Sequence, residues 1–448
     1  MVSKKFNLKI ANKISSFKKT IEVDSDKSIS IRSFLIGAIS QNISLVKNVL
    51  ESEDVMSTID CLKKLGVKIT KKNKNEYQIF GKGFGSFFLK KKNIKLNFGN
   101  SGTLARLLIG TLSTTPGIKV NITGDDSLNK RNMKSLIDLM IKFGAYFLPK
   151  NKYNFPLTLI SSQMPIGISY KSGVSAQLKS AVILAGLNSY GSTKIIEIHK
   201  SRDHTENMML NNSQTIQIKK NKNNIITISG KKYLNPFKID VPNDPSSAAF
   251  FSALTLLNEN SFLKIKRVGL NKTRTGFYEL LKKQGAKIKF KNLKKNNNEL
   301  IGDVYIESCK LKPIYASKKI YASMTDEYPI LFVMAALING TSTFNGISEL
   351  ANKESNRIIE MQKVLDQIEI KSKISYNNFK IYGKGMIDAK NKIINVPALG
   401  DHRICMSSFI LALLTGAKTK IKNFETVYTS SPSFLKIMRI LGAKFEIQ

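Results

Sequence analysis

A short unit recurs along the chain: an amphipathic helical stretch ends in glycine plus one small residue, and a strand-like run follows at once. Four clear copies and two less regular ones lie at 58–69, 135–147, 279–290, 434–447, 358–374 and 205–218. A glycine in the left-handed conformation ends such a helix and lets the chain turn directly into a strand. The spacing predicts about six α/β units.

A second kind of helix alternates with the first and is apolar on every face, which is typical of a buried helix. Its copies lie at 31–40, 175–187, 246–257, 328–338 and 404–416. A break near residue 240 divides the units three and three. We therefore expect an α/β fold with two similar domains, one spanning 25–239 and the other 240–448, with residues 1–24 returning to the second domain.

Composition excludes several classes of protein. With 448 residues, 42% of them hydrophobic, the chain has enough apolar mass for two cores. Its apolar runs are shorter than the roughly 18–20 residues that a membrane helix needs, and the N-terminus lacks the apolar core of a secretory signal. The 3 cysteines are far apart and form no CxxC pattern. These features predict a cytoplasmic protein with reduced thiols and no metal cluster.

The net charge of +39 allows two interpretations. A nucleic-acid-binding protein would carry such a charge, but the lysines are spread along the whole chain, which favours a generally basic surface and no nucleic-acid partner. Arginine is scarce, with nine residues among the 71 basic ones. Because arginine binds carboxylates and phosphates through paired donors, the few arginines suggest several anion contacts.

Small and cationic residues precede the buried helices in the first half. Lys27, Ser28 and Arg32 open the first of them, and the positive end of a helix favours anions. Similar starts contain Gly102 in GNSGT and Ser175, Ala176 and Gln177 in SAQLKSA. Each allows an ordinary helix cap or tight turn as well as an anion site. Arg131 and Arg202 follow in polar segments that allow a solvated side chain or a binding role.

Acidic residues cluster with cations in the second half. Asp326 precedes an apolar helix, where it could cap the helix or act as a base. Lys353 and Arg357 are four residues apart, and we expect them on one helical face beside Glu354. Two cations can keep that carboxylate ionised or hold it as a proton donor near an anion. Arg403 stands in GDHR before the last buried helix.

Nine motifs in order, DKSISxR, GNSGT, SAQLKSA, SRDHTE, VPNDPSSAAFF, TRTG, DEYP, KESNR and GDHR, resemble the 3-phosphoshikimate 1-carboxyvinyltransferase (EPSP synthase) family. The resemblance covers about residues 14–446. It implies two domains of three βαβαββ units, an inside-out α/β barrel arrangement with a cleft between the domains. It also implies transfer of the enolpyruvyl group of phosphoenolpyruvate to the 5-hydroxyl of shikimate 3-phosphate with release of phosphate, without metal or cofactor, and inhibition by glyphosate.

The resemblance assigns roles to the candidate residues. Asp326 resembles the base, Glu354 the proton donor and acceptor, and Lys27 a catalytic residue that touches both substrates. Shikimate 3-phosphate would be bound by Lys27, Ser28, Arg32, Ser175, Ala176, Gln177, Arg202, Asp326 and Lys353. Phosphoenolpyruvate would be bound by Lys27, Gly102, Arg131, Gln177, Arg357 and Arg403. The first domain would bind mainly shikimate 3-phosphate, the second mainly phosphoenolpyruvate, and we expect a monomer.

Some positions depart from the family pattern. Asp24-Ser25 replaces a usual Pro-Gly, Ser431 stands where an aromatic is common, and Asn356 replaces the Asp of KESDR.

Three other functions remain alternatives at this stage. A UDP-N-acetylglucosamine enolpyruvyltransferase would usually have Asn after the first Lys and a loop cysteine, and this chain has neither. The others are a basic nucleic-acid-binding protein and a decayed enzyme.

Overall fold

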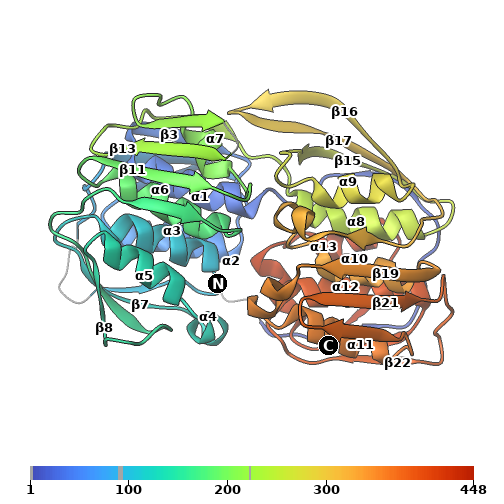
Figure 1. The fold of residues 1–448 in the computed structure, drawn as a ribbon. Coiled ribbons are helices and arrows are strands. Elements are labelled where there is room, and N and C mark those ends of the chain that lie inside the picture. The colour runs from blue at the N-terminus through green and yellow to red at the C-terminus, as the bar shows by residue number, and fades with distance from the viewer. Residues whose placement is uncertain (1–3, 89–93, 221–222) are drawn as a thin grey trace. The chain divides into compact units, whose positions relative to one another are not determined.

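The computed structural model describes residues 4–88, 94–220 and 223–448. Two compact units divide the chain, each with its own hydrophobic core. The first unit comprises Ser25–Val241 with the short segment Asn296–Glu299. The second comprises the chain up to Asp24, Pro242–Lys295 and Leu300–Gln448. Helices and strands alternate through both units (Figure 1).

The first unit contains three buried helices, each accompanied by more amphipathic ones. Its helices are α1 (Lys27–Ile39), α2 (Glu53–Lys64), α3 (Gly102–Ser113), α4 (Asp126–Lys130), α5 (Lys134–Lys142), α6 (Ala176–Leu187) and α7 (His204–Met209). Its strands are β3 (Gln41–Lys47), β4 (Lys68–Asn73), β5 (Glu76–Lys82), β6 (Lys95–Asn97), β7 (Lys119–Thr123), β8 (Tyr146–Leu148), β9 (Leu157–Ile160), β10 (Ser169–Ser172), β11 (Ser192–Glu197), β12 (Ile216–Lys220), β13 (Asn224–Ser229) and β14 (Lys238–Asp240).

The second unit repeats the same organisation with three additional 3-10 helices. Its helices are α8 (Pro245–Leu257), α9 (Gly276–Lys283), η1 (Lys318–Ser323), α10 (Tyr328–Ala336), η2 (Ser348–Asn352), α11 (Arg357–Asp366), α12 (His402–Thr415), η3 (Phe424–Thr429) and α13 (Phe434–Ile440). Its strands are β1 (Leu8–Ile10), β2 (Lys18–Ile21), β15 (Phe262–Gly269), β16 (Lys287–Asn296), β17 (Glu299–Glu307), β18 (Tyr315–Ala316), β19 (Gly340–Asn345), β20 (Ser372–Ser375), β21 (Asn378–Gly383), β22 (Ile393–Val396), β23 (Lys418–Ile421) and β24 (Glu446–Ile447).

Within the described ranges, six four-stranded sheets share one topology. In each sheet, a parallel pair of strands is joined antiparallel to a third strand, beside which a fourth lies; β10, β11, β13 and β12 form one example. In the second unit, β1 pairs with β23 and β24, and β2 pairs with β15, so the N-terminal segment completes two of its sheets. The sixfold repeat expected from the sequence is confirmed.

Local sequence explains where the amphipathic helices end. Four glycines just beyond α2, α5, α9 and α13 have φ between 86° and 95°, a left-handed conformation that glycine adopts without strain: Gly66, Gly144, Gly285 and Gly442. After α11 the left-handed position is taken by Glu369 instead, with φ of 58°. All residues of α8, α10 and α12 lie in the interior, and most of them are apolar or small.

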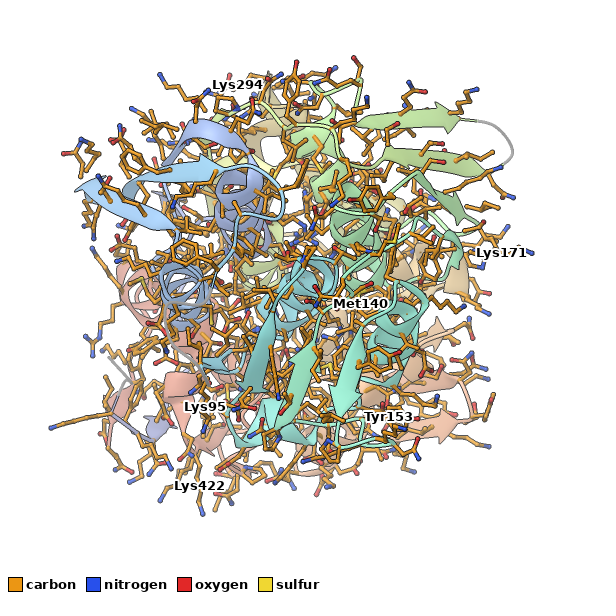
Figure 2. The ribbon with its side chains drawn as sticks, turned by 90° about the vertical axis from the view of Figure 1, so that its left-hand side faces the viewer. Lys95, Met140, Tyr153, Lys171, Lys294 and Lys422 are labelled. Carbon is orange, nitrogen blue, oxygen red and sulfur yellow. The ribbon has the colours of Figure 1, made fainter. Side chains whose placement is uncertain are left out.

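Exposed lysine side chains account for much of the high positive net charge. Lys95, Lys171, Lys294 and Lys422 are exposed and point outward from different sheets and loops, whereas Met140 lies in the core (Figure 2). No helix in the described ranges combines the length and the apolar character needed to cross a bilayer.

Candidate active site

The N-terminal end of α1 places the first group of predicted residues. Asp26 caps the helix, and its Oδ1 accepts a hydrogen bond of 2.8 Å from the Ile29 amide. Lys27 is therefore the first helical residue, and its Nζ lies 3.0 Å from Asp54 Oδ2 on α2. One turn later, Arg32 Nη1 donates to the Ser28 carbonyl at 3.1 Å. The predicted shared face of Ser28 and Arg32 is confirmed by this contact.

Arg32 is buried and is held by hydroxyl groups of two other helices. Its Nε donates to Thr205 Oγ1 on α7 at 2.9 Å, and its Nη2 donates to Ser180 Oγ on α6 at 3.3 Å. Arg202 is half-buried in the loop that leads to α7. The structure thus brings α1, α6 and α7 together around one guanidinium group.

The starts of α3 and α6 meet through a chain of side-chain hydrogen bonds. Ser101 and Ser175 are the N-caps of these helices, so the ordinary reading of Ser175 as a cap is confirmed. Gln177 Nε2 donates to Thr103 Oγ1 at 2.9 Å, and Arg106 Nη1 donates to Gln177 Oε1 at 2.8 Å. Sequence analysis missed Arg106, although it lies one helical turn after Gly102, the spacing that indicates a shared face.

Gly102 and Arg131 belong to this same group. Arg131 is the C-cap of the short helix α4, which the sequence analysis did not expect, and its Nη2 donates to Asn100 Oδ1 and, at 3.3 Å, to Ser127 Oγ. A Cβ built on Gly102 would lie 2.9 Å from Arg106 Nη1 and 3.0 Å from Arg131 Nη1. Two guanidinium groups therefore border the glycine, and Arg131 is half-buried rather than solvated.

In the second unit, three carboxylates surround the buried side chain of Arg357. Its Nε donates to Asp401 Oδ2 at 2.9 Å, its Nη2 to Glu354 Oε2 at 2.6 Å, and its Nη1 to Asp326 Oδ1 at 3.5 Å. Burial alone would lower the pKa of Arg357, but the charges of the three carboxylates raise it. The guanidinium stays charged and fixes the two predicted acid–base residues beside each other.

One prediction about this segment is wrong. Lys353 and Arg357 do not share a helical face, because Lys353 follows η2 with an extended backbone and α11 begins only at Arg357. Asn356 is the N-cap between them, and its Oδ1 accepts a hydrogen bond of 3.3 Å from the Ile359 amide. Asp326 likewise does not cap α10: its carboxylate contacts Arg357, and Glu327 occupies the cap position without a capping hydrogen bond.

Arg403 is held close to this cluster. Its amide donates to Asp401 Oδ1 at 2.9 Å, so Asp401 both caps α12 and binds Arg357. The Arg403 side chain is 4% exposed and lies over the Phe250 ring, 5.6 Å from its centroid. Among the described residues, Nε and Nη1 of Arg403 have no hydrogen-bond partner. Buried donors of this kind are costly unless a ligand completes them.

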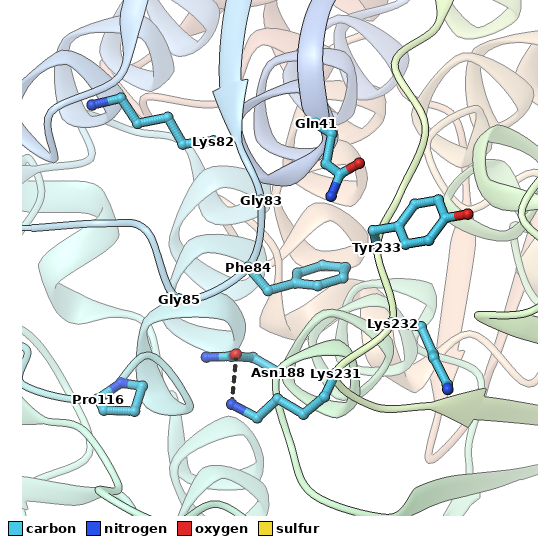
Figure 3. Close-up of a pocket in the computed structure, with 10 residues that line it drawn as sticks. All are labelled: Gln41, Lys82, Gly83, Phe84, Gly85, Pro116, Asn188, Lys231, Lys232 and Tyr233. Atoms are coloured by element: carbon cyan, nitrogen blue, oxygen red, sulfur yellow. Dashed lines mark hydrogen bonds between the residues drawn. The ribbon is translucent and has the colours of Figure 1, made fainter.

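A separate hollow of about 500 Å³ lies in the first unit (Figure 3). It is lined by Gln41, Lys82, Gly83, Phe84, Gly85, Pro116, Asn188, Lys231, Lys232 and Tyr233. Gln41, Pro116 and Asn188 follow the C-terminal ends of α1, α3 and α6, about 18 Å along each helix from the predicted residues. Lys231 Nζ donates to Asn188 Oδ1 at 3.0 Å, and the lysines are exposed. This hollow is therefore distinct from the candidate site.

Carboxylates and cations, rather than metal-ligand clusters, characterise the candidate site. No group of three or more histidine, cysteine, aspartate or glutamate side chains suited to a metal ion occurs in the part of the chain that the structure describes. The arrangement can bind anions at the N-terminal ends of α1, α3 and α6. In the second unit it can transfer protons through Asp326 and Glu354 beside a buried arginine.

Comparisons with known proteins extend over nearly the whole chain. The family model for EPSP synthase (3-phosphoshikimate 1-carboxyvinyltransferase) matches residues 11–438. A 3-phosphoshikimate 1-carboxyvinyltransferase of Paramagnetospirillum magneticum is 36% identical over 425 residues, with 94% of each chain covered. One of Bacillus subtilis is 36% identical over 434 residues, covering 97% of this chain and 99% of the relative.

Solved structures give the same result. An EPSP synthase structure from Acinetobacter baumannii matches with a TM-score of 0.84 and 33% identity, covering 99% of this chain and all of the other. The enolpyruvyl transferase NikO from Streptomyces tendae shares the fold at 13% identity, with a TM-score of 0.76. The chain belongs to the EPSP synthase (3-phosphoshikimate 1-carboxyvinyltransferase) family.

Proposed function

We propose that this protein transfers the enolpyruvyl group of phosphoenolpyruvate to the 5-hydroxyl of shikimate 3-phosphate, releasing phosphate. The observation that carries the proposal is the cluster of the second unit: Asp326 and Glu354 are held by Arg357, next to the buried and incompletely hydrogen-bonded Arg403. An acid–base pair beside an arginine that needs an anion suits an anionic enol phosphate donor. Membership of the family names the reaction.

We propose that the first unit binds mainly shikimate 3-phosphate. Its anionic groups would be held at the positive N-terminal end of α1 by Lys27, Ser28 and Arg32. The N-terminal end of α6 would contribute Ser175, Ala176 and Gln177, with Arg202 close by. Hydrogen bonds from Arg32 to Thr205 and Ser180 support this role, because they fix the guanidinium before any ligand arrives. Lys353 and Asp326 would complete the contacts.

We propose that Arg131, Arg357 and Arg403 bind phosphoenolpyruvate. Arg403 has donors available in the interior, and Arg357 has one long contact, 3.5 Å to Asp326, that a ligand oxygen could replace. Gly102, Arg131, Gln177 and Lys27 would provide further contacts from the first unit. The hydrogen bonds of Arg106 to Gly102 and Gln177 support adding it to these proposed contacts.

The proposed chemistry is addition followed by elimination. Asp326 takes the proton of the 5-hydroxyl as its oxygen attacks C2 of phosphoenolpyruvate, and Glu354 gives a proton to C3, forming a tetrahedral intermediate. Glu354 then takes a proton back from C3 as the C2–O bond to phosphate breaks, and the departing phosphate takes the proton held by Asp326. The Arg357 guanidinium holds Glu354 at 2.6 Å and so positions its carboxyl group for both steps.

We also infer a cytoplasmic location, which agrees with free thiols at Cys61, Cys309 and Cys405. A monomeric state stays a prediction.

A coupled phosphate-release assay tests the proposed function. We expect phosphate release from phosphoenolpyruvate only when shikimate 3-phosphate is present, and none with UDP-N-acetylglucosamine as the acceptor. Release with UDP-N-acetylglucosamine, or none with either acceptor at saturating concentrations, would overturn the proposal.

A further inference from the structure

Lys179 on α6 is completely buried, with an exposed fraction of 0%. Its Nζ lies 2.6 Å from Glu197 Oε1, at the end of β11, and 2.7 Å from Glu206 Oε1, on α7. Lysine is almost never fully buried unless it is paired, because removing the ammonium group from water is costly. One cation here joins three segments of the first unit.

The carboxylate of Glu197 extends this network to the loop that carries Arg202. Its Oε1 accepts hydrogen bonds from the Ser201 amide at 3.0 Å and the Ser201 hydroxyl at 3.2 Å. Its Oε2 accepts from Asn224 Nδ2 at 2.8 Å. Because Ser201 directly precedes Arg202, the Lys179–Glu197 pair fixes the start of that loop.

The carboxylate of Glu206 extends the network toward Arg32. Glu206 neighbours Thr205, and Lys179 neighbours Ser180; the two hydroxyl groups share a hydrogen bond of 2.8 Å. Both hydroxyls also accept from Arg32. The ion pair and the hydroxyl pair therefore join α6 to α7 at successive residues, and this register sets where the acceptors of Arg32 lie.

The ion pair with Lys179 leaves the second oxygen of Glu206 without a hydrogen bond among the described residues. This oxygen, Oε2, is buried. Burial raises the pKa of Glu206, whereas the charge of Lys179 opposes the rise. Replacing such a network by apolar residues is often neutral or favourable for stability, so stability alone gives little reason for it.

We propose that Lys179 is a positioning residue for shikimate 3-phosphate binding: by pairing with Glu197 and Glu206 it holds α6, α7 and the Ser201–Arg202 loop in the register that aims Arg32 and Arg202. Lys179 touches no substrate in this proposal and acts through those arginines. The inference rests on the proposed function, because it takes the two arginines as phosphate or carboxylate ligands.

The test is the pair of variants Glu206→Gln and Lys179→Met/Glu206→Gln in the full chain. The first fills the same volume, and the second avoids leaving Glu206 as a buried anion without its cation. We expect the KM for shikimate 3-phosphate to rise severalfold in the first and about tenfold or more in the second, since small misplacements of positioning groups are costly. The KM for phosphoenolpyruvate should stay within about twofold in both.

Two control variants separate positioning from stability. Val182→Ala removes two methyl groups from the same buried helix, and Lys134→Met breaks the exposed Lys134–Asp138 pair of 2.7 Å on α5. We expect both to keep both KM values, even where Val182→Ala lowers the melting temperature as much as the test variants do.

Each outcome decides between the possibilities. An unchanged KM for shikimate 3-phosphate in folded Glu206→Gln and in the double variant overturns the inference, and so does an equal rise of both KM values. If the double variant does not fold, Glu206→Gln decides alone. Failure of the wild-type chain to release phosphate with shikimate 3-phosphate would instead overturn the proposed function, whatever the variants do.

Discussion

The Asp24 carboxylate accepts a hydrogen bond of 2.8 Å from the Ser431 hydroxyl, although 407 residues separate them in the chain. The same oxygen, Oδ2, accepts from the Ser433 amide at 3.0 Å. Asp24 stands where the family pattern has proline, and Ser431 where an aromatic is common. The two departures are therefore partners: besides the Ser433 amide, the buried carboxylate of Asp24 meets a hydroxyl group that an aromatic residue other than tyrosine could not supply.

This pair gives a pH-dependent prediction. The pKa of Asp24 is raised from its ordinary value of 3.8, chiefly by burial, and the hydrogen bonds from Ser431 and Ser433 only partly oppose the rise. A raised pKa in the folded state means that folding binds a proton, so stability present at acid pH is lost as pH rises through the folded pKa. We expect Asp24→Asn to be more stable than wild type at pH 7, with the gap closing near pH 4. Urea unfolding at both pH values measures this.

Ser431→Ala provides the opposite control. Loss of a hydrogen bond to a charged group should cost about 1.5–3 kcal/mol at pH 7 and less at pH 4, because the raised pKa of Asp24 favours its protonated form at acid pH. Equal losses at both pH values would show that the hydroxyl does not stabilise the charged form.

A second prediction concerns Arg403. Its buried donors lack hydrogen-bond partners among the described residues, which costs stability in the unliganded protein. We expect Arg403→Met to raise the melting temperature and to weaken phosphoenolpyruvate binding by about a hundredfold or more. Thermal unfolding and calorimetric titration measure the two effects. A lower melting temperature would show that the contact of Arg403 with Phe250 outweighs its unsatisfied donors.

A third prediction concerns Glu354. We expect Glu354→Gln to reduce kcat by about 10²–10⁴ while both substrates still bind, because an amide keeps the shape but cannot donate or accept the proton. Rates from the phosphate-release assay and binding of shikimate 3-phosphate by titration provide the readouts. Near wild-type kcat would remove Glu354 from the mechanism.

A fourth prediction concerns Gly102. The added methyl of Gly102→Ala would press on the ends of Arg106 and Arg131, 2.9 Å and 3.0 Å away, and these flexible ends can shift. We expect the glyphosate inhibition constant to rise about tenfold or more, because glyphosate is longer than phosphoenolpyruvate. The KM for phosphoenolpyruvate should rise by a smaller factor. Competition kinetics on both forms decide, and equal changes for the two ligands would contradict a role of shape.

A fifth prediction concerns the other departure, Asn356. It caps α11 as the Asp of the family pattern would, since both side chains accept the hydrogen bond of the Ile359 amide. We expect Asn356→Asp to change stability and kcat little, and Asn356→Ala to cost about 0.5–2 kcal/mol. Denaturant unfolding compares the two. A large loss of activity in Asn356→Asp would mean that the added charge disturbs Glu354 or Arg357.

Local signals made much of the fold predictable. The glycines after α2, α5, α9 and α13 act within one turn of chain, so their sequence context is enough to end a helix. The runs of mostly apolar and small residues are equally clear signals of buried helices, because they show apolar side chains on every face. Lys353 shows the limit of such reasoning: a spacing of four residues was read as a helical face, but the Asn356 cap starts the helix after it.

Contacts between distant segments could not be predicted in the same way. Lys179 stands in an otherwise apolar run, which indicates a buried and paired lysine, but the sequence does not identify its two glutamate partners, because they lie on other elements. The sequence indicates that Asp401 caps a helix, and the structure confirms it. Its hydrogen bond with Arg357 could not be predicted, because it depends on how α11 and α12 pack. Arg106 could have been predicted from the sequence, because its spacing of one helical turn from Gly102 is a local signal.

The pairing of β1 with β23 and β24 has a consequence for how the chain folds during synthesis. The first unit is almost continuous in sequence and can fold once Val241 has left the ribosome, whereas β1 must wait for strands more than 400 residues later. Asn7 and Gln448 exchange backbone hydrogen bonds of 2.8 Å and 2.9 Å, so they lie side by side. A short peptide could therefore connect Gln448 to the segment that contains Asn7. A circular permutant that begins at Ser25 and carries the segment up to Asp24 after Gln448 would then emerge as two nearly uninterrupted blocks, and β1 would be made directly after the strands with which it pairs.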